Sequence, residues 1–217
     1  MPRSKSNGVF ITLEGGEGGG KTTQVARLSE RLKDAGFSVY QTREPGGTPA
    51  AEALRNFLLF GEENFCWQSE IMLHMAARVD HLTRAIRPAL AEGKIVLCDR
   101  FHDSTWAYQG YGIGEGQAEV LNYISSLRQL VGGEPDVTFW LDLPCELARQ
   151  RMAQRGGKLD RYEGQHMQFH QRVRAGFQAI AEKDPARIVR VDASRSVEDV
   201  QDHLYDLVQQ RLAGRTA

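Results

Sequence analysis

Short apolar runs alternate with longer amphipathic stretches along the whole chain. Runs of strand length and strand composition occupy residues 9–13, 37–42, 94–99, 137–143 and 187–191. Between them hydrophobic residues recur at helical spacing, as Val25, Leu28 and Leu32 do. These stretches predict helices over 21–35, 49–60, 67–91, 165–182 and 197–212. Three further helices are predicted: one from 104 to a glycine-rich loop at 110–116, one from that loop to 131, and one from 144 to a break at 156–157.

Strands that alternate with helices predict an α/β fold, in which a five-stranded parallel sheet is flanked by helices on both faces. Ligands of such sheets bind at the carboxyl ends of the strands. The loops that begin at Gly15, Arg43, Asp99 and Asp192 all follow strands, so we expect them to share one edge. Without a repeat or a linker, residues 9–213 are expected to form a single domain, and residues 1–8 a disordered polar head.

Composition narrows the class of protein. The 217 residues are 41% hydrophobic and 25% charged, as is ordinary for a globular protein, and the net charge of −1 gives no basic excess for nucleic acid. No apolar run of about 18 residues is present, and the polar start lacks the apolar core of a signal peptide. The 3 cysteines are widely spaced, which suggests neither a disulfide framework nor a zinc site and fits the cytoplasm.

Residues 15–22 read Gly-Gly-Glu-Gly-Gly-Gly-Lys-Thr and directly follow the first apolar run. This is the G-x-x-x-x-G-K-[ST] phosphate loop in its required place between a strand and a helix. Glycines let successive backbone N–H groups point at a polyphosphate, and the helix that starts near Lys21 adds its positive end. A glycine-rich turn that matched by chance would not be expected to lie between a strand and a helix. The dinucleotide-binding fingerprint G-x-G-x-x-G is excluded, because no frame of this stretch fits it.

Two further groups of residues carry charge that could act on a bound phosphate. Asp99 ends the third apolar strand, where a carboxylate can assist Mg²⁺ and the adjacent Arg100 can bind a phosphate; a plain strand-end ion pair is the alternative. Several arginines surround Gly156-Gly157 and suggest a closing lid over residues 149–164, although a basic helix end can simply be solvated. The arginines in question are Arg149, Arg151, Arg155 and Arg161.

Four further motifs accompany the phosphate loop: Thr-Arg-Glu-Pro-Gly-Gly-Thr (42–48), Ala-Ala-Arg (76–78), Ser-Thr-Trp-Ala-Tyr-Gln (104–109) and Leu-Asp-Arg-Tyr-Glu (159–163). With these motifs the chain resembles the thymidylate kinases, specifically the bacterial type that has its catalytic arginine in the lid. The resemblance runs from about residue 9 to about residue 192. It implies a P-loop NTPase fold of the nucleoside monophosphate kinase type and transfer of the γ-phosphoryl group of ATP to dTMP, with Mg²⁺ and a homodimer.

Matching positions imply the following roles. Catalysis would involve Lys21, Arg155, Arg100 and Glu17. ATP would contact Gly15, Gly16, Glu17, Gly18, Gly19, Gly20, Lys21, Thr22, Thr23 and, after the last strand, Arg195. The acceptor would contact Glu44, Arg55, His74, Arg78, Arg100, Thr105, Tyr108, Gln109, Asp160 and Glu163. Thr22 and Asp99 would hold Mg²⁺, partly through water.

Two positions depart from the family pattern. His74 stands where the family usually has a phenylalanine, so an imidazole would stack on the base in its place. The lid carries one residue more than in some relatives at 156–158, which leaves the register of Arg151 and Arg155 open by one position.

Other interpretations remain. Another P-loop nucleoside monophosphate kinase would share the phosphate loop, and a non-catalytic nucleotide-binding protein would keep Lys21 without needing arginines in a lid. A GTPase switch would need the motif Asn-Lys-x-Asp, which the sequence lacks. His166 and His170 have the spacing of a zinc pair but no third ligand beside them, so a solvated helix face is favoured. Trp106, Tyr108 and Tyr111 are expected to form a pocket wall near the base, because no basic stripe accompanies them.

Overall fold

The computed structural model describes residues 8–156 and 160–216, without the side chains of Arg155, Arg215 and Thr216. A five-stranded sheet runs in the order β2-β3-β1-β4-β5, and all neighbouring strands are parallel. The strands are β1 (Val9–Glu14), β2 (Val39–Arg43), β3 (Ile95–Asp99), β4 (Val137–Asp142) and β5 (Ile188–Asp192). The predicted α/β class and strand count are confirmed.

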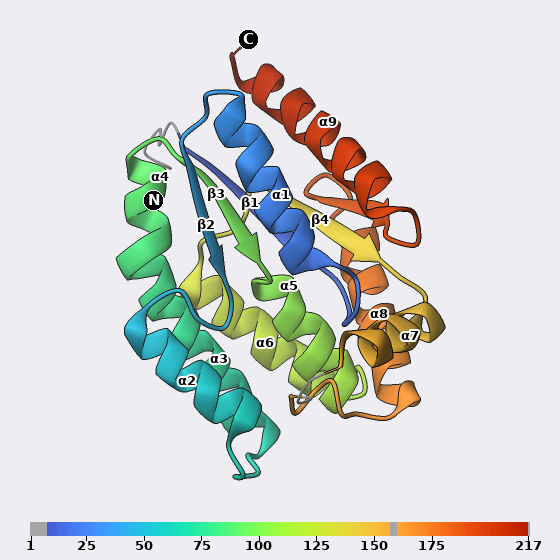
Figure 1. The fold of residues 1–217 in the computed structure, drawn as a ribbon. Coiled ribbons are helices and arrows are strands. Elements are labelled where there is room, and N and C mark those ends of the chain that lie inside the picture. Colours follow the sequence, from blue (N-terminus) through green and yellow to red (C-terminus); the bar gives the residue numbers. More distant parts are fainter. Residues whose placement is uncertain (1–7, 157–159, 217) are drawn as a thin grey trace.

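Helices cover both faces of the sheet (Figure 1). They are α1 (Lys21–Asp34), α2 (Pro49–Phe60), α3 (Trp67–His81), the π-helical turn η1 (Leu82–Ile86), α4 (Arg87–Ala91), α5 (His102–Thr105), the π-helical segment η2 (Trp106–Ile113), α6 (Ala118–Val131), α7 (Cys145–Arg155), α8 (Met167–Lys183) and α9 (Val197–Thr216). α1 and α9 pack on one face, and α4, α6 and α8 lie on the other.

The alternation of side chains along β1 explains the two layers. Ile11 and Leu13 are fully buried against the α1 and α9 side, where Leu28 and Leu204 belong to the same apolar cluster. Phe10 points to the opposite face and joins a cluster with Leu82 and Ile86. Apolar residues on both faces are what a parallel sheet with two helical layers requires.

One predicted loop is helical instead. The glycine-rich stretch 110–116 was expected to interrupt the helix after residue 104, but η2 continues to Ile113. Gly112 lies against α8, where a Cβ atom would come within 2.6 Å of Phe169. Small residues permit this close approach of η2 to α8, and tertiary packing therefore overrides the low helix propensity of glycine. The long predicted helix 67–91 is continuous, with a π-helical turn in its middle.

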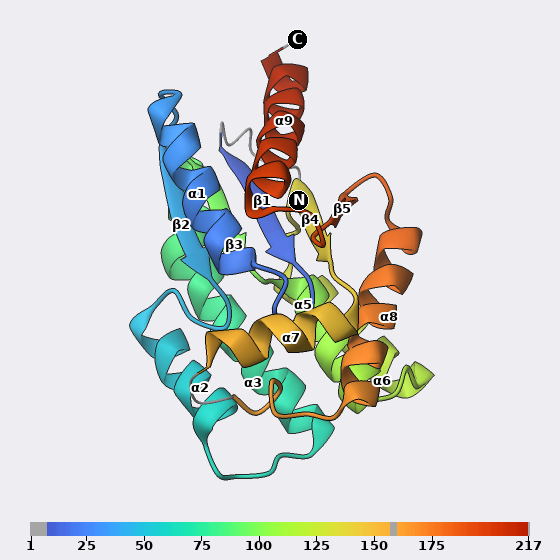
Figure 2. The same ribbon diagram turned by 45° about the vertical axis from the view of Figure 1, so that its right-hand side comes forward.

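The loops that follow the strands share one edge, as predicted. Parallel register aligns Arg43 with Asp99 and Asp142 with Asp192, so the phosphate loop, the Arg43 loop and the Asp99 loop emerge together. α7 lies across this carboxyl edge (Figure 2). The predicted polar head falls outside the described residues except for Gly8, and so does the predicted helix break at Gly157.

Candidate active site

The phosphate loop is built by backbone conformations that only glycine adopts easily. Gly15 has φ 141°, and Gly18 and Gly20 have φ 69° and 80°. A Cβ atom on Gly15 would meet the carbonyl oxygen of Leu141 at 2.5 Å, and one on Gly18 would meet that of Ala148 at 2.7 Å. The loop therefore needs glycine both for its torsion angles and for its close contact with the end of β4 and with α7.

Lys21 begins α1 and folds back over the phosphate loop. Its Nζ donates a 2.7 Å hydrogen bond to the carbonyl oxygen of Gly16. Burial and the nearby Arg100 lower the pKa of Lys21 to about 8, against the opposing effect of Glu17. The ammonium thus lies in a place where an added phosphate anion would be strongly favourable.

Asp99, the strand-end residue predicted for the metal site, lies directly beside the phosphate loop. Thr22 Oγ1 donates a 2.6 Å hydrogen bond to Asp99 Oδ2. A hydroxyl and a carboxylate oxygen therefore converge at the start of α1, and oxygen atoms of these two kinds are the ligands that Mg²⁺ prefers. The donor set fits the ion that phosphate-loop proteins use.

Arg100 follows Asp99 in the left-handed region, with φ 70°. Its guanidinium binds Glu17 Oε1 at 2.6 Å, the carbonyl oxygen of Gly15 at 2.8 Å and the Tyr108 hydroxyl at 3.0 Å. Burial raises the pKa of Glu17, but Arg100, Lys21 and the hydrogen bond from Tyr108 outweigh it and bring that pKa down to about 2. Glu17 is consequently an anion that faces the cationic side of the site.

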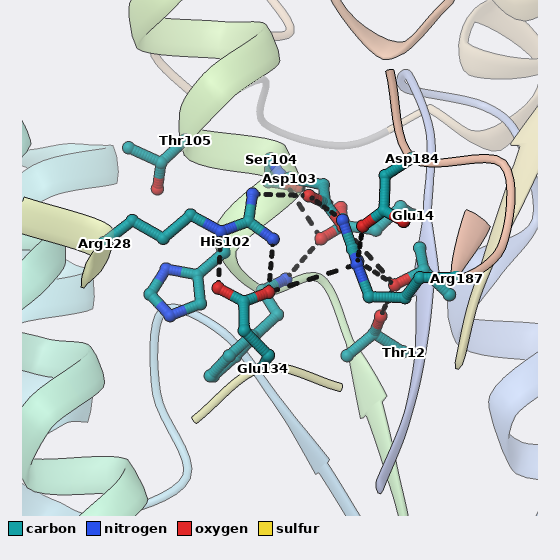
Figure 3. Close-up of polar contacts among 12 residues, drawn as sticks. Thr12, Glu14, His102, Asp103, Ser104, Thr105, Arg128, Glu134, Asp184 and Arg187 are labelled. Atoms are coloured by element: carbon teal, nitrogen blue, oxygen red, sulfur yellow. Dashed lines mark hydrogen bonds and ion pairs between the residues drawn. The ribbon is translucent and has the colours of Figure 1, made fainter. Parts of the chain in front are cut away.

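Glu14 holds the Arg100 loop in this unusual conformation. Its carboxylate accepts hydrogen bonds from Phe101 N at 2.7 Å and from Ser104 Oγ at 2.5 Å (Figure 3). Burial and the neighbouring Asp103 raise the pKa of Glu14 to about 7, against the opposing effect of its hydrogen bonds and of Arg100. The last residue of β1 is thus tied to the segment that carries Arg100, which connects the phosphate loop to the strand-end arginine.

Behind Glu14 lies a closed cluster of ion pairs (Figure 3). Asp103, only 1% exposed, accepts hydrogen bonds from Arg128 at 2.8 Å and from Arg187 at 2.7 Å and 3.0 Å. Burial raises the pKa of Asp103, but the two arginines outweigh it and lower that pKa to about 2. Asp103 did not stand out in the sequence, because a single Asp in a polar stretch carries no pattern.

A cavity of about 440 Å³ connects the phosphate loop to the second side of the site. Its walls include most of the residues that the resemblance assigns to nucleotides: Glu17, Gly18, Gly20, Lys21, Thr22, Thr23, Glu44, Arg55, His74, Arg78, Asp99, Arg100, Thr105, Tyr108, Gln109, Asp160 and Glu163. Gly16 instead borders a second cavity, of about 410 Å³, between α7 and α8.

The far end of the main cavity is lined by Arg78 of α3. Its Nε donates to Glu44 Oε2 at 2.6 Å, and its two Nη atoms donate to Thr105 Oγ1 at 3.1 Å and to the carbonyl oxygen of Phe101 at 3.0 Å. Arg78 is 3% exposed, so these bonds fix its position firmly. A rigid guanidinium of this kind is suited to recognise a carbonyl group on a planar ligand.

The predicted lid arginines do not gather at one point. Arg151 lines the main cavity and donates to the carbonyl oxygen of Ala193 at 3.0 Å, whereas Arg149 lines the second cavity. Arg161 turns away and donates to the carbonyl oxygens of Gly61 and Glu63 at 2.9 Å and 2.7 Å. The Arg155 side chain lies outside the described residues. Of the arginines whose side chains the structure describes, then, only one of the predicted cluster reaches the main cavity.

The structure also shows where the remaining candidate residues lie. Arg195 borders neither cavity and lies 3.7 Å from Asp199. Of the predicted aromatic wall only Tyr108 lines the main cavity, because Trp106 and Tyr111 pack in the apolar layer with α8. His166 and His170 border the second cavity. The described residues contain no group of three or more His, Cys, Asp or Glu side chains that could hold a metal ion.

A phosphate loop, a strand-end aspartate beside it and a second cationic region in the same cavity together define a P-loop phosphotransferase that acts on nucleotides. The model of the thymidylate kinase family matches residues 13–204. The chain belongs to the thymidylate kinase family, whose members are enzymes that phosphorylate dTMP with ATP.

Known relatives agree with this membership. A thymidylate kinase of Gluconobacter oxydans (strain 621H) is 57% identical over 205 residues, which are 94% of this chain and 96% of that protein. One from Synechococcus sp. (strain JA-3-3Ab) is 48% identical over 208 residues, or 94% and 97% of the two chains. The crystal structure of thymidylate kinase from Ehrlichia chaffeensis superimposes with a TM-score of 0.74 at 36% identity and covers 93% of this chain and 98% of that one.

Within the described residues, no helix is long and apolar enough to cross a membrane.

Proposed function

We propose that this protein transfers the γ-phosphoryl group of ATP to dTMP in the cavity between the phosphate loop and Arg78. The observation that carries the proposal is that Lys21 and Arg78 line the same cavity of about 440 Å³. One end offers a cradle for a polyphosphate, and the other offers a rigid guanidinium for a base. Two nucleotides can therefore bind with their phosphates facing each other.

On the donor side, the backbone of residues 15–20 and the ammonium of Lys21 bind the phosphates of ATP. Thr22 and Asp99 would hold Mg²⁺, which supplies positive charge against the phosphate oxygens. Arg195 remains a candidate for the adenine end, although it lies outside both cavities.

On the acceptor side, Arg55 and Arg100 bind the phosphate of dTMP. Arg55 is held by a 2.9 Å hydrogen bond to the carbonyl oxygen of Pro45, and Arg100 by Glu17. The second pKa of a phosphate monoester is about 6, so the attacking oxygen is largely deprotonated at neutral pH and needs no general base. Positioning and charge stabilisation carry the catalytic effect, with Glu17 placed to accept from the sugar hydroxyl.

Residues of the lid complete the site. Asp160 and Glu163 line the main cavity and are held together, because Asp160 Oδ1 accepts from the backbone N of Glu163 at 2.9 Å. Arg155 ends α7 one residue before Gly156, which has φ 64°. From this position Arg155 brings a further positive charge to the transferring phosphoryl group.

We also propose a cytoplasmic homodimer in which residues 9–213 of each chain form one domain. Partly exposed apolar side chains on the outer helices support a packing surface: Phe57 and Phe60 on α2, Met72 and Val79 on α3, and Leu130 on α6. Light scattering on the purified protein, which measures its mass in solution, checks the dimer.

A phosphate-acceptor screen tests the reaction. With ATP and Mg²⁺ we expect ADP release with dTMP and little with dCMP, because Arg78 and Gln109 favour a base with a carbonyl at ring position 4. The acceptors dUMP, dGMP and AMP complete the screen. A preference for another monophosphate would show a different kinase of the same fold. No acceptor-dependent ADP release at all would favour a nucleotide-binding protein without this activity.

A further inference from the structure

Four polar side chains form a buried group at the base end of the main cavity. Glu70 and His74 come from α3, Gln109 from η2 and Tyr162 from the turn that precedes α8. They are 5%, 7%, 2% and 6% exposed. Glu70 and Tyr162 have no role in the function proposed above, and a buried polar group without such a role calls for an account of its hydrogen bonds.

The Tyr162 hydroxyl lies at the centre of the group. It is 2.7 Å from Glu70 Oε1, 2.9 Å from Gln109 Nε2 and 3.1 Å from His74 Nε2. A phenol has one proton to donate and can accept the others. Since a carboxylate only accepts, the proton goes to Glu70, and the hydroxyl oxygen accepts from the other two partners.

This arrangement fixes the protonation of His74. Its Nε2 must carry the hydrogen, because the Tyr162 hydroxyl has already given its own proton to Glu70. Burial, together with the positive charges of Arg78, Arg161 and Arg55, lowers the pKa of His74 to about 3. His74 is therefore a neutral imidazole with a defined tautomer at ordinary pH.

The same group fixes which way the Gln109 amide faces. Gln109 Nε2 lies 3.0 Å from Glu70 Oε1 and 2.9 Å from the Tyr162 hydroxyl, so the amide turns its donor nitrogen toward this pair. If the amide were reversed, its oxygen would face the Glu70 carboxylate, and two acceptors would meet in a buried place. The Gln109 oxygen is consequently the amide atom left for a ligand in the cavity that Gln109 lines.

We propose that Glu70 and Tyr162 are positioning residues that hold the Gln109 amide with its oxygen toward the base, so that the site requires a pyrimidine with a hydrogen on N3. This rests on the proposed function. Thymine and uracil offer that N–H beside a carbonyl group, which matches an acceptor on Gln109 and a donor on Arg78. Cytosine offers a bare N3 and an amino group, which places acceptor against acceptor and donor against donor.

The test replaces Glu70 with Gln and measures kcat/KM for dTMP and for dCMP on the full-length protein. An amide at position 70 can donate as well as accept, so both orientations of Gln109 become possible. We expect kcat/KM for dTMP to fall about tenfold, while kcat/KM for dCMP stays level or rises. The ratio of kcat/KM for dTMP to kcat/KM for dCMP should therefore fall at least tenfold. Glu30→Gln, the same change at an exposed position of α1, should leave both values unchanged.

Tyr162→Phe is a second variant that removes a single oxygen atom. Because Glu70 still binds the Gln109 amide directly, the ratio of kcat/KM for dTMP to kcat/KM for dCMP should also fall, but by a smaller factor. A parallel fall of kcat/KM for both substrates in the two variants, with unchanged melting temperatures, would overturn the proposal. Lack of dTMP phosphorylation by the unchanged protein would instead contradict the proposed function.

Discussion

Two charge-rich regions lie on either side of the segment that follows β3, and they differ in how their charges are matched. Around Asp103 the ions are closed in, because Arg128 and Arg187 are 15% and 11% exposed and each binds carboxylates on more than one side. Around Lys21 the cavity wall holds one more basic than acidic side chain: the basic ones are Lys21, Arg43, Arg55, Arg78, Arg100 and Arg151, and the acidic ones are Glu17, Glu44, Asp99, Asp160 and Glu163. The first region is complete without a ligand.

The difference shows what each region is for. A buried ion-pair cluster around Asp103 joins α5, β4, α6 and the residue before β5, and Thr138 links it to Thr12 of β1. Its hydrogen bonds are satisfied, so it has nothing left to offer an anion. The region around Lys21 has an excess of cations and opens into a cavity. Changes in the first should therefore alter the free energy of unfolding, and changes in the second should alter turnover.

The largest effect is expected from Lys21→Ala. Loss of the ammonium should lower kcat about 10³-fold or more, since this charge stabilises the phosphates as the γ-phosphoryl group moves. Binding of dTMP, measured by calorimetry, should survive, because the base contacts lie at the other end of the cavity. Lys33→Ala, at an exposed position later in α1, is the control and should keep normal turnover. Normal kinetics in the Lys21 variant would refute its assigned role.

Asp103→Asn should lower the free energy of unfolding and, unlike Lys21→Ala, leave turnover nearly unchanged. Removing one partner leaves two arginines without their shared anion, and breaking a buried pair costs about 3 kcal/mol or more. Urea unfolding at neutral pH measures this loss, and we expect kcat of the folded variant to stay within a few-fold of normal. A variant with unchanged stability but lost turnover would place Asp103 in the catalytic region instead.

Acid should weaken the Asp103 cluster in a defined range. The folded pKa of Asp103 is about 2, below its ordinary value of 3.8. The native state binds fewer protons between these values, so the contribution is present above pH 3.8 and disappears as pH falls toward 2, by about 2 kcal/mol. The free energy of unfolding, measured from pH 5 to pH 2, should fall less steeply with pH in Asp103→Asn than in the unchanged protein. Equal slopes would mean that Asp103 is not the group that responds to acid.

The smallest effect is expected at a surface pair. Arg27 and Glu198 join α1 to α9 at 3.0 Å, but their side chains are 45% and 71% exposed. Water and salt screen such a pair, so Arg27→Ala should leave the free energy of unfolding nearly unchanged and turnover unaffected. A loss as large as that of Asp103→Asn would show that burial does not govern the difference between the two kinds of ion pair.

Local patterns were enough to predict the sheet and the phosphate loop. The run at 9–13 and the glycines before Lys21 have their effect within a few residues of the chain, as do the apolar spacings of α1. The strand-end position of Asp99 follows from the same kind of reasoning, since parallel strands bring their carboxyl ends together.

Contacts between distant segments explain what the sequence did not predict. Glu14 ends an apolar strand and was not singled out, yet it binds the backbone of Phe101, 87 positions away. Arg161 belongs to the arginine-rich stretch but binds carbonyl groups between α2 and α3. Such partners depend on the assembled fold, and a charged residue in a single sequence does not indicate which segment it will face.

The most direct measurement is a crystal structure of the protein with dTMP and a non-hydrolysable ATP analogue. The account predicts that the γ-phosphate lies against Lys21, that the dTMP phosphate lies between Arg55 and Arg100, and that the thymine edge meets Arg78 and Gln109. Thymidine bound in the cavity between α7 and α8, away from Arg78, would contradict it.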